Sequence, residues 1–261
     1  MEIRFSKYHG TGNDFILIDD RSESFDLSNT RLVKAMCSRR FGIGADGLIL
    51  LRPVEHFDFH MVYFNSDGNQ STMCGNGGRC IVQFAKDLGL INQDCRFLAI
   101  DGEHEASIVE FQNIKLKMGS IDNVHRDGNA IVLDTGSPHY VVRRKDVDTI
   151  DVKKEGSEIR YSELYKEEGI NVNFIEVVGD KLKVATYERG VEDETYSCGT
   201  GVTAAALAIQ ILEPNRLESP ISIETKGGEL KVFFEQKNAN QFTNIWLEGP
   251  AVKTFVGDWA G

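Results

Sequence analysis

The chain has 261 residues, 41 % of them hydrophobic, and its 29 Lys and Arg residues face 40 Asp and Glu residues for a formal net charge of −11. This much apolar sequence can build one large domain or two of ordinary size. The acidic balance, together with the lack of any Lys/Arg block of five or more, argues against a nucleic-acid partner.

Membrane insertion and export are not expected. No apolar stretch approaches the length needed to span a bilayer, and the start MEIRFSKYHG lacks the apolar core of a signal peptide. We therefore expect a cytoplasmic protein with no membrane partner. The cysteines are odd in number, sparse and without a CxxC pair, so reduced thiols are expected at Cys37, Cys74, Cys80, Cys95 and Cys198.

Short apolar or alternating segments separated by Gly, Asn and Asp predict strands. In the first half they cover residues 15–19, 48–51, 57–64, 97–100, 107–111 and 114–118. In the second half they cover residues 131–133, 140–143, 173–178, 182–187, 221–225, 230–235 and 244–247, with hairpin turns at Gly179-Asp180 and Gly227-Gly228.

Helices are fewer. They are predicted over residues 30–40, 75–88, 162–168 and 199–212, the second capped by Gly89 and the last stopped before Pro214. The segment 202–211 has almost no polar side chain, which is typical of a helix enclosed on all sides.

The chain contains an internal repeat. Thr11, Tyr63 and Cys74 of the first half recur as Thr135, Tyr187 and Cys198, each 124 residues later. A period this long is outside the range of short solenoid repeats, so it indicates two copies of one domain.

These observations predict an α+β fold of two pseudo-symmetric domains, each a mixed or antiparallel sheet curled around a central helix. The predicted halves are residues 1–120, carrying Cys74, and residues 121–250, carrying Cys198, with the boundary in the polar run 119–129. The segment 251–261 is a candidate to pack back on the first half.

Cys74 and Cys198 each precede a Gly-X-Gly turn that opens the buried helix of its half. The amino-terminal end of a helix carries partial positive charge, which lowers the pKa of a neighbouring thiol and favours a bound anion. The other three cysteines lack such a motif and are interpreted as small buried hydrophobes.

Two such thiols facing each other across a domain interface would suit inversion of a stereocentre beside a carboxylate. One thiolate removes the α-proton and the other thiol delivers a proton from the far side. The helix N–H groups at Gly75, Asn76, Gly199 and Thr200 would stabilise the developing enediolate, so neither a cofactor nor a metal is expected.

Three polar residues lie within or beside the duplicated landmarks. His139 and Glu188 are candidates to set the protonation states of the two thiols. Arg189, beside a Gly-rich turn, is a candidate for a bidentate carboxylate contact.

The motifs, taken together, resemble those of the diaminopimelate epimerase family over nearly the whole chain. They are HGTGNDF from His9, GIGADG from Gly42, NSDG from Asn65, MCGNG from Met73, NVNF from Asn171, and YERG from Tyr187 through to CGTG at Cys198. The resemblance implies a pyridoxal-independent epimerase that interconverts LL- and meso-diaminopimelate in lysine and cell-wall precursor synthesis, with two domains closing over the substrate.

By the same resemblance, Cys74 and Cys198 would be the acid/base pair and His139 and Glu188 would tune them. The implied substrate-binding residues are Asn13, Asn65, Gly75, Asn76, Asn171, Glu188, Arg189, Gly199 and Thr200. Two positions depart from the pattern, with Ser137 where many relatives have Asn and Gly47 where many have Gln. The expected partner is a small amino-acid substrate, and a homodimer is left open.

Other protein classes fit the sequence motifs less well. Proline racemases and hydroxyproline epimerases share the two-cysteine logic, but their motifs resemble Met-Cys-Gly-His-Gly and Asp-Arg-Ser-Pro-Cys rather than MCGNG and YSCGTG. The run Gly42–Gly47 matches a dinucleotide GxGxxG, yet it is predicted to follow a helix and precede a strand, the reverse of a nucleotide loop. A thiol redox protein would need a resolving cysteine, and a metal protein would need a His/Cys cluster that the spacing does not provide.

Overall fold

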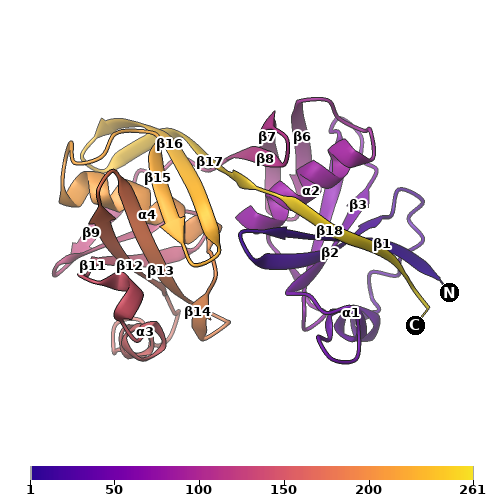
Figure 1. Cartoon of the computed structure of the whole chain (residues 1–261), viewed down its shortest axis with the longest axis horizontal. Helices are drawn as coiled ribbons and strands as arrows, with labels where there is room; N and C mark the ends of the chain where they lie inside the picture. The colour runs from indigo at the N-terminus through magenta and orange to yellow at the C-terminus, as the bar shows by residue number, and fades with distance from the viewer. Residues whose placement is uncertain (1, 261) are drawn as a thin grey trace. The chain divides into compact units, whose positions relative to one another are not determined.

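The computed structural model describes residues 2–260, and the chain divides into two compact units. Unit 1 consists of Met1–Leu116 and Gly249–Gly261, and unit 2 is Lys117–Glu248. Each unit combines a mixed sheet with two α-helices (Figure 1), and unit 2 also contains a short 3₁₀ helix, η1 (Val147–Thr149). The α+β prediction is thereby confirmed.

The sheet of unit 1 runs in the order β18-β1-β2-β3-β4-β6-β7-β8, with the short β5 added to β4. The pairs β2/β3 and β4/β6 are parallel and the others antiparallel. The strands are β1 (Ile3–Gly10), β2 (Asn13–Asp19), β3 (Gly47–Arg52), β4 (Phe59–Asn65), β5 (Gln70–Ser71), β6 (Asp94–Ala99), β7 (Gly102–Glu110), β8 (Asn113–Lys117) and β18 (Val252–Trp259).

Unit 2 repeats this order as β9-β10-β11-β12-β13-β15-β16-β17, with β14 added to β13 and parallel pairs at β11/β12 and β13/β15. Its strands are β9 (Val124–Asp127), β10 (Ala130–Asp134), β11 (Pro138–Arg143), β12 (Asn171–Val178), β13 (Lys181–Glu188), β14 (Asp193–Thr195), β15 (Ile221–Thr225), β16 (Gly228–Asn238) and β17 (Gln241–Pro250). The sequence repeat therefore corresponds to a repeated strand order.

Strand β18 completes unit 1 from the far end of the chain. It pairs antiparallel with β1, with Ser6 opposite Val256 and His9 opposite Val252. In unit 2 the corresponding partner of β10 is β9, which directly precedes it in sequence. The first copy thus takes its outer strand from the carboxyl-terminal segment.

A helix lies at the centre of each unit. Helix α2 (Gly75–Asp87) contacts β1, β2, β3 and β7, and α4 (Gly199–Leu212) contacts β10, β11, β12, β13, β15 and β16. Residues 202–209 of α4 are all buried, so this helix has no solvent-facing side over its middle. An apolar run such as AAALAI can fill that position because it leaves no polar side chain unpaired.

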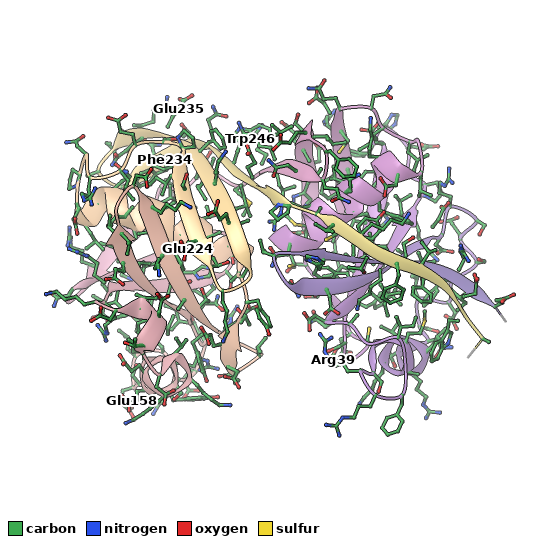
Figure 2. The ribbon with its side chains drawn as sticks, viewed as in Figure 1. Arg39, Glu158, Glu224, Phe234, Glu235 and Trp246 are labelled. Atoms are coloured by element: carbon green, nitrogen blue, oxygen red, sulfur yellow. The ribbon has the colours of Figure 1, made fainter. Side chains whose placement is uncertain are left out.

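A second helix covers the other face of each sheet. Helix α1 (Thr30–Cys37) buries Val33 and Met36 in a cluster with Ile16, Leu48 and other strand residues. Helix α3 (Val152–Arg160) buries Val152 and leaves Glu158 exposed (Figure 2). Because the central strands are covered on both faces, they read as continuous apolar runs such as LILL at residues 48–51.

The first turns of α1 and α3 are capped by side chains. Asn29 Oδ1 accepts a hydrogen bond from Leu32 N at 3.1 Å, and Asp151 Oδ1 accepts one from Lys154 N at 3.0 Å. Gly156 of α3 is required by packing, because a Cβ there would lie 2.4 Å from Tyr187 Cβ.

Several predicted elements need correction. Residues 162–168 form turns, and the helix of this region is α3, which precedes them. The first helix ends at Cys37 rather than residue 40. The polar run 119–129 contains β9 and lies within unit 2, since the boundary falls between Leu116 and Lys117.

Strands β1, β5, β9, β14 and β18 were not predicted, and the turn expected at Gly227-Gly228 lies one residue earlier, because Gly228 already pairs with Thr225. The remaining strands and the two central helices are confirmed, with some ends shifted. Among the helices of residues 2–260, none has the length and apolar composition needed to cross a membrane.

Replacing a buried side chain of α4 tests the importance of this central helix. Leu207→Ala removes a side chain that is fully buried in the unit 2 core and should lower the free energy of unfolding by about 2–5 kcal/mol. The matched control Leu164→Ala, at a position 71 % exposed, should change it by less than about 0.5 kcal/mol. Urea titration followed by circular dichroism measures both, and equal losses would contradict the enclosed position of α4.

Candidate active site

Cys198 is the residue at which α4 begins. Its backbone is extended, with φ −113° and ψ 116°, and its carbonyl oxygen accepts the first helical bond from Val202 N at 2.9 Å. The residue is 8 % exposed. The sulfur therefore lies at the amino-terminal end of an otherwise enclosed helix, where backbone N–H groups lack intrahelical acceptors.

A chain of polar side chains leads to this sulfur. Cys198 Sγ lies 3.4 Å from Thr200 Oγ1, which lies 2.9 Å from His139 Nε2. The other imidazole nitrogen, Nδ1, lies 2.9 Å from Asn173 Nδ2. Three strands and one helix end thus contribute to a single connected set, because Thr186 Oγ1 donates to Asn173 Oδ1 at 3.0 Å.

His139 is neutral at physiological pH. Its side chain is fully buried, and this burial, with a smaller contribution from the positive charge of Arg189, lowers its pKa to about 3. A neutral imidazole can donate from one nitrogen and accept at the other, so it can transmit a hydrogen-bond direction from Asn173 to Thr200.

Asn171 organises a second group at the same sheet edge. Its Nδ2 donates to Ser137 Oγ at 2.9 Å and to Pro138 O at 3.0 Å, while its Oδ1 accepts from Arg189 N at 2.9 Å. The exposed Arg189 guanidinium donates to Ser137 Oγ at 3.3 Å and to Glu168 O at 2.9 Å. Asn171 therefore braces the turns that carry Ser137 and Arg189.

Strand register explains why these residues meet. His139 of β11 lies opposite Asn171 of the parallel β12, and the antiparallel β12/β13 register ends with Val172 opposite Tyr187, one residue before Glu188. His139, Asn171 and Glu188 therefore lie at one edge of the unit 2 sheet.

In unit 1, Cys74 begins α2 as Cys198 begins α4. Its backbone has φ −99° and ψ 134°, and its carbonyl oxygen accepts from Gly78 N at 2.7 Å. Cys74 Sγ lies 3.6 Å from Asn13 Oδ1, which also accepts from Asn76 Nδ2 at 3.2 Å. The structure thus brings together three of the predicted site residues of this unit.

Arg79 holds the first turn of α2 from inside the core. The side chain is fully buried, and its nitrogens donate to Asn76 Oδ1 at 2.8 Å, Gly75 O at 3.2 Å and Thr11 Oγ1 at 3.4 Å. Burial lowers its pKa to about 10, so it remains protonated at neutral pH. By occupying Asn76 Oδ1 it directs the amide Nδ2 of Asn76 toward Asn13.

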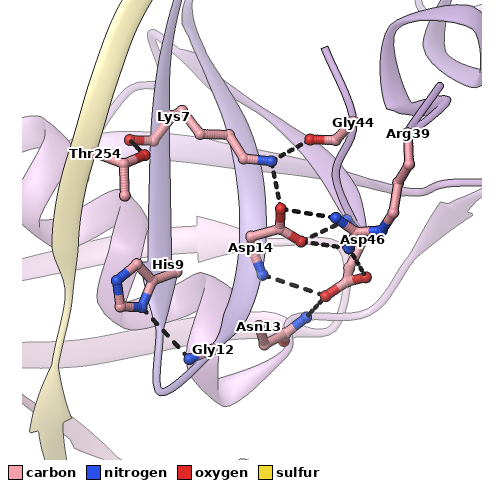
Figure 3. A network of polar contacts seen from close by, with 9 residues as sticks. All are labelled: Lys7, His9, Gly12, Asn13, Asp14, Arg39, Gly44, Asp46 and Thr254. Atoms are coloured by element: carbon pink, nitrogen blue, oxygen red, sulfur yellow. Dashed lines mark hydrogen bonds and ion pairs between the residues drawn. The ribbon is translucent and has the colours of Figure 1, made fainter. Parts of the chain in front are cut away.

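A charged network fixes Asn13 from the other side (Figure 3). Asn13 Nδ2 donates to Asp46 Oδ2 at 2.7 Å, and Arg39 donates to Asp46 Oδ1 at 2.6 Å and to Asp14 Oδ1 at 2.7 Å. Lys7 Nζ, which also bonds to the Gly44 carbonyl, lies 2.5 Å from Asp14 Oδ2. Because Asp46 takes the Asn13 amide nitrogen, the Asn13 oxygen is the atom that faces Cys74.

Burial raises the pKa of Asp14, but hydrogen bonds from Arg39 and Lys7 outweigh this effect and lower its pKa to about 2. The carboxylate is therefore ionised throughout the physiological range. Its charge compensates Lys7, whose side chain is 7 % exposed.

Asn65 and Gly47 lie at the unit 1 edge that carries Asn13. Gly47 of β3 is opposite Asn65 of β4, and Asn65 is exposed. A Cβ at position 47 would lie 2.5 Å from Tyr63 Cε2 and 2.6 Å from Phe64 O. A glutamine at this position would not fit here without a backbone shift.

The remaining cysteines lie in the core. Burial raises the pKa of Cys37 and of Cys95 to about 12 and raises that of Cys80 further. Their thiols stay protonated at neutral pH, in agreement with their interpretation as small hydrophobes.

Sequence reasoning missed Asp46, Arg79 and Asn173. Asp46 lies in the Gly42–Gly47 run, which follows α1 and precedes β3 as expected and acts as a turn that orients Asn13. Asn173 shares a strand face with Asn171, since residues i and i+2 point the same way, and a second asparagine in an apolar strand was the available signal. Among residues 2–260, no group of three or more His, Cys, Asp or Glu side chains is arranged to hold a metal.

A model of the protein family described as diaminopimelate epimerase matches residues 5–124 and 131–254 of the chain. The chain is 51 % identical over 254 residues to the diaminopimelate epimerase of Flavobacterium psychrophilum, covering 97 % of this chain and 98 % of that protein. It is 43 % identical to the diaminopimelate epimerase of Chlorobaculum tepidum, covering 95 % of this chain and 98 % of that protein. It is 36 % identical to the diaminopimelate epimerase of Aquifex aeolicus, covering 98 % of this chain and 97 % of that protein.

Solved structures share the fold at low identity. A phenazine biosynthesis protein of the PhzF family from Bacillus anthracis is similar with a TM-score of 0.80 and 13 % identity, covering 100 % of both chains. A hydroxyproline epimerase from Agrobacterium vitis is similar with a TM-score of 0.70 and 11 % identity, covering 98 % of this chain and 92 % of that one. At these identities the likeness shows the fold alone.

The burial of Cys37, Cys80 and Cys95 predicts an order of thiol reactivity. At pH 8, iodoacetamide should modify the partly exposed Cys74 more than about 100-fold faster than Cys37 or Cys95, whose raised pKa leaves little thiolate. Mass spectrometry of digested protein measures the labelling of each cysteine, and guanidinium-unfolded protein, in which all five should react alike, is the control. Labelling of Cys95 as fast as Cys74 would contradict this burial.

Removing the Asp14 charge should destabilise unit 1. Asp14→Asn leaves the buried Lys7 ammonium without its carboxylate and should cost up to about 3–5 kcal/mol of unfolding free energy at pH 7. Because the folded pKa of Asp14 is about 2, below the unfolded value near 3.9, its contribution is complete above pH 4 and is lost as the pH falls toward 2.

The control for this variant is Asp258→Asn, which removes an exposed ion pair with Arg4 and should change the free energy of unfolding by less than about 1 kcal/mol. Urea unfolding at pH 7, 4 and 2.5 provides the comparison. A difference between wild type and Asp14→Asn that stayed constant down to pH 2.5 would show that the carboxylate charge is not its source.

Proposed function

The chain belongs to the diaminopimelate epimerase family, and we propose that Cys74 and Cys198 are the acid/base pair with which it interconverts LL- and meso-diaminopimelate. The family and the names of the curated relatives support an isomerase acting in lysine biosynthesis. The chemical groups at the amino-terminal ends of α2 and α4 support the mechanism, and no cofactor enters it.

The observation that carries the proposal is the repeated position of the two cysteines. Each is the residue at which the central helix of its unit begins, in units whose strands follow the same order. The amino-terminal end of a helix favours negative charge, both that of a thiolate and that of a substrate carboxylate. Two equivalent groups of this kind are what proton transfer on opposite faces of one carbon requires.

In the proposed reaction, the thiolate of one cysteine takes the α-proton of the substrate. The C–H bond breaks, its electron pair becomes part of an enediolate, and an S–H bond forms. The thiol of the other cysteine then donates its proton to the opposite face of the α-carbon and is left as a thiolate. The roles exchange in the reverse direction, so the reaction needs no oxidant, reductant or pyridoxal group.

Stabilisation of the enediolate is assigned to the helix ends. Gly75, Asn76, Gly199 and Thr200 belong to the first turns of α2 and α4, whose backbone N–H groups would donate to the α-carboxylate. Such donors are already oriented before the charge develops, which is the main source of their catalytic effect.

We assign His139 and Glu188 to tuning the cysteines. His139 is neutral and reaches Cys198 through Thr200. Glu188 lies at the same sheet edge, one residue beyond Tyr187, which pairs with Val172. In this position a carboxylate would influence the protonation of groups at the end of α4.

Substrate binding is assigned to polar residues around each helix end. Those of unit 1 are Asn13, Asn65 and Asn76, and those of unit 2 are Asn171, Glu188 and Arg189. Arg189 offers a guanidinium suited to a carboxylate, and Asn171 holds the backbone of Arg189 in place. The reactive cysteines must remain reduced for this chemistry, which supports a cytoplasmic location.

Exchange of the α-proton with solvent tests this function. In heavy water, wild-type protein should introduce deuterium at the α-carbon of LL-diaminopimelate and none into L-proline. Cys74→Ser and Cys198→Ser should each lower the epimerisation rate by about 10²–10⁴-fold, because one face loses its proton donor or acceptor. Nuclear magnetic resonance of the recovered substrate measures both exchange and inversion.

Cys95→Ala is the matched control, since it removes a buried thiol of the same chain that has no assigned role. It should keep exchange near the wild-type rate. Near-normal turnover of either serine variant would overturn the two-cysteine mechanism, and labelling of L-proline alone would favour the proline racemase class.

A further inference from the structure

We propose that Asn173 is a positioning residue, which fixes the tautomer of His139 and thereby aims the Thr200 hydroxyl proton at Cys198 Sγ. The catalytic consequence of this inference rests on the proposed function. The hydrogen-bond direction itself does not, because it can be measured without any turnover.

The orientation of the Asn173 amide sets the direction of the chain. Its Oδ1 accepts from Thr186 Oγ1 at 3.0 Å, and its Nδ2 lies 2.9 Å from His139 Nδ1 and 3.5 Å from the Tyr140 carbonyl oxygen. The Tyr140 carbonyl oxygen can only accept a hydrogen bond, so the Asn173 atom next to it must be the amide nitrogen. The same nitrogen therefore faces His139. Asn173 is also held opposite Thr186 by the β12/β13 register.

The donor and acceptor of each further hydrogen bond, from His139 to Cys198, follow from the orientation of the Asn173 amide. Because Asn173 Nδ2 donates to His139 Nδ1, that nitrogen carries no proton, and the neutral imidazole must carry its proton on Nε2. Nε2 then donates to Thr200 Oγ1 at 2.9 Å. Because Thr200 Oγ1 accepts this hydrogen bond, its own proton is available to donate to another acceptor. Cys198 Sγ lies 3.4 Å from Thr200 Oγ1 and is in position to accept it.

A hydroxyl that donates to sulfur stabilises the thiolate relative to the thiol. The chain from Thr186 to Cys198 would thus favour the ionised form of this cysteine. Arg189 is the charged group that acts on the imidazole, and its positive charge helps to keep His139 neutral.

Unit 1 shows that the fold does not require this polar chain. The positions 124 residues before His139 and Asn173 are Phe15 and Ile49, both fully buried. Ile49 and Asn173 also pack against corresponding glycines of the central helices. A Cβ on Gly77 would lie 3.2 Å from Ile49 Cδ1, and a Cβ on Gly201 would lie 2.5 Å from Asn173 Oδ1. One copy fills these positions with apolar side chains and the other with a hydrogen-bonded imidazole and amide.

Burying polar groups where apolar groups suffice costs free energy unless they are fully bonded, and it is not needed for packing. The polar set in unit 2 is therefore best explained by its end point, Cys198. This reasoning distinguishes Asn173 from residues that only support the sheet.

The first measurement is the tautomer of His139 in the free protein. Long-range proton–nitrogen correlation spectra of ¹⁵N-histidine-labelled protein report which imidazole nitrogen carries the proton, and a His139→Gln variant assigns the signal among the six histidines. We expect the Nε2–H form in wild type. In Asn173→Asp the carboxylate can only accept, so the proton should move to Nδ1. An Nδ1–H form in wild type would overturn the proposal.

The second measurement is a double-mutant cycle. Asn173→Asp and Thr200→Val should each lower kcat for diaminopimelate about 10- to 100-fold with little change in KM, and the double variant should be no slower than the worse single variant. Thr200→Ser keeps the hydroxyl and should retain most of the activity. Independent, multiplying losses would show that Asn173 does not act through Thr200 and would overturn the proposal.

The two measurements separate this inference from the proposed function. A wild-type protein that shows the Nε2–H tautomer, with the shift in Asn173→Asp, but exchanges no α-proton of diaminopimelate would refute the proposed function and leave the direction of the chain established. Full activity with the Nδ1–H tautomer would do the reverse.

Discussion

A helix that is enclosed on all sides can meet a ligand only at its ends, and this constraint limits where the central helices can contribute to a ligand site. The middles of both α2 and α4 are buried throughout. At the amino-terminal end, each of these helices begins with a cysteine and a turn rich in glycine. Gly77 and Gly201 allow neighbouring side chains to approach the first turn more closely than a Cβ would permit.

The two copies share a scaffold but surround their cysteines differently. In unit 1, Arg79 and Asp46 act from opposite sides to set the amides of Asn76 and Asn13, and the oxygen of Asn13 faces Cys74. In unit 2, an imidazole and a hydroxyl lead to Cys198. Under the proposed mechanism, these unlike polar surroundings would give the two thiols different protonation properties, which identical surroundings would not do.

The sequence predicted those elements whose own composition is distinctive, such as apolar strands and an apolar helix. Helix α4 was predicted with its observed ends because its composition leaves no alternative, and the buried strands were predicted from apolar runs. Helix α3 was missed, since VKKEGSEIR is polar and contains a glycine, while residues 162–168 have helical composition but form turns. The strand β18 depends on β1, which lies at the other end of the chain, and no local pattern reports such a pairing.

The repeat held information that local patterns lacked. Shifting α1 by 124 residues places a helix over residues 154–161, which overlaps α3. The same shift of 124 residues also compares the two copies residue by residue. Both copies keep the cysteine before the central helix and the glycine two residues after the helix start, so these residues serve a need that the two copies share. Positions that are apolar in one copy and polar in the other cannot be dictated by packing alone, and Asn173 and His139 are of this second kind. Duplication therefore supplies an internal control, in which one half of the chain shows what the fold needs and the other shows what has been added to it.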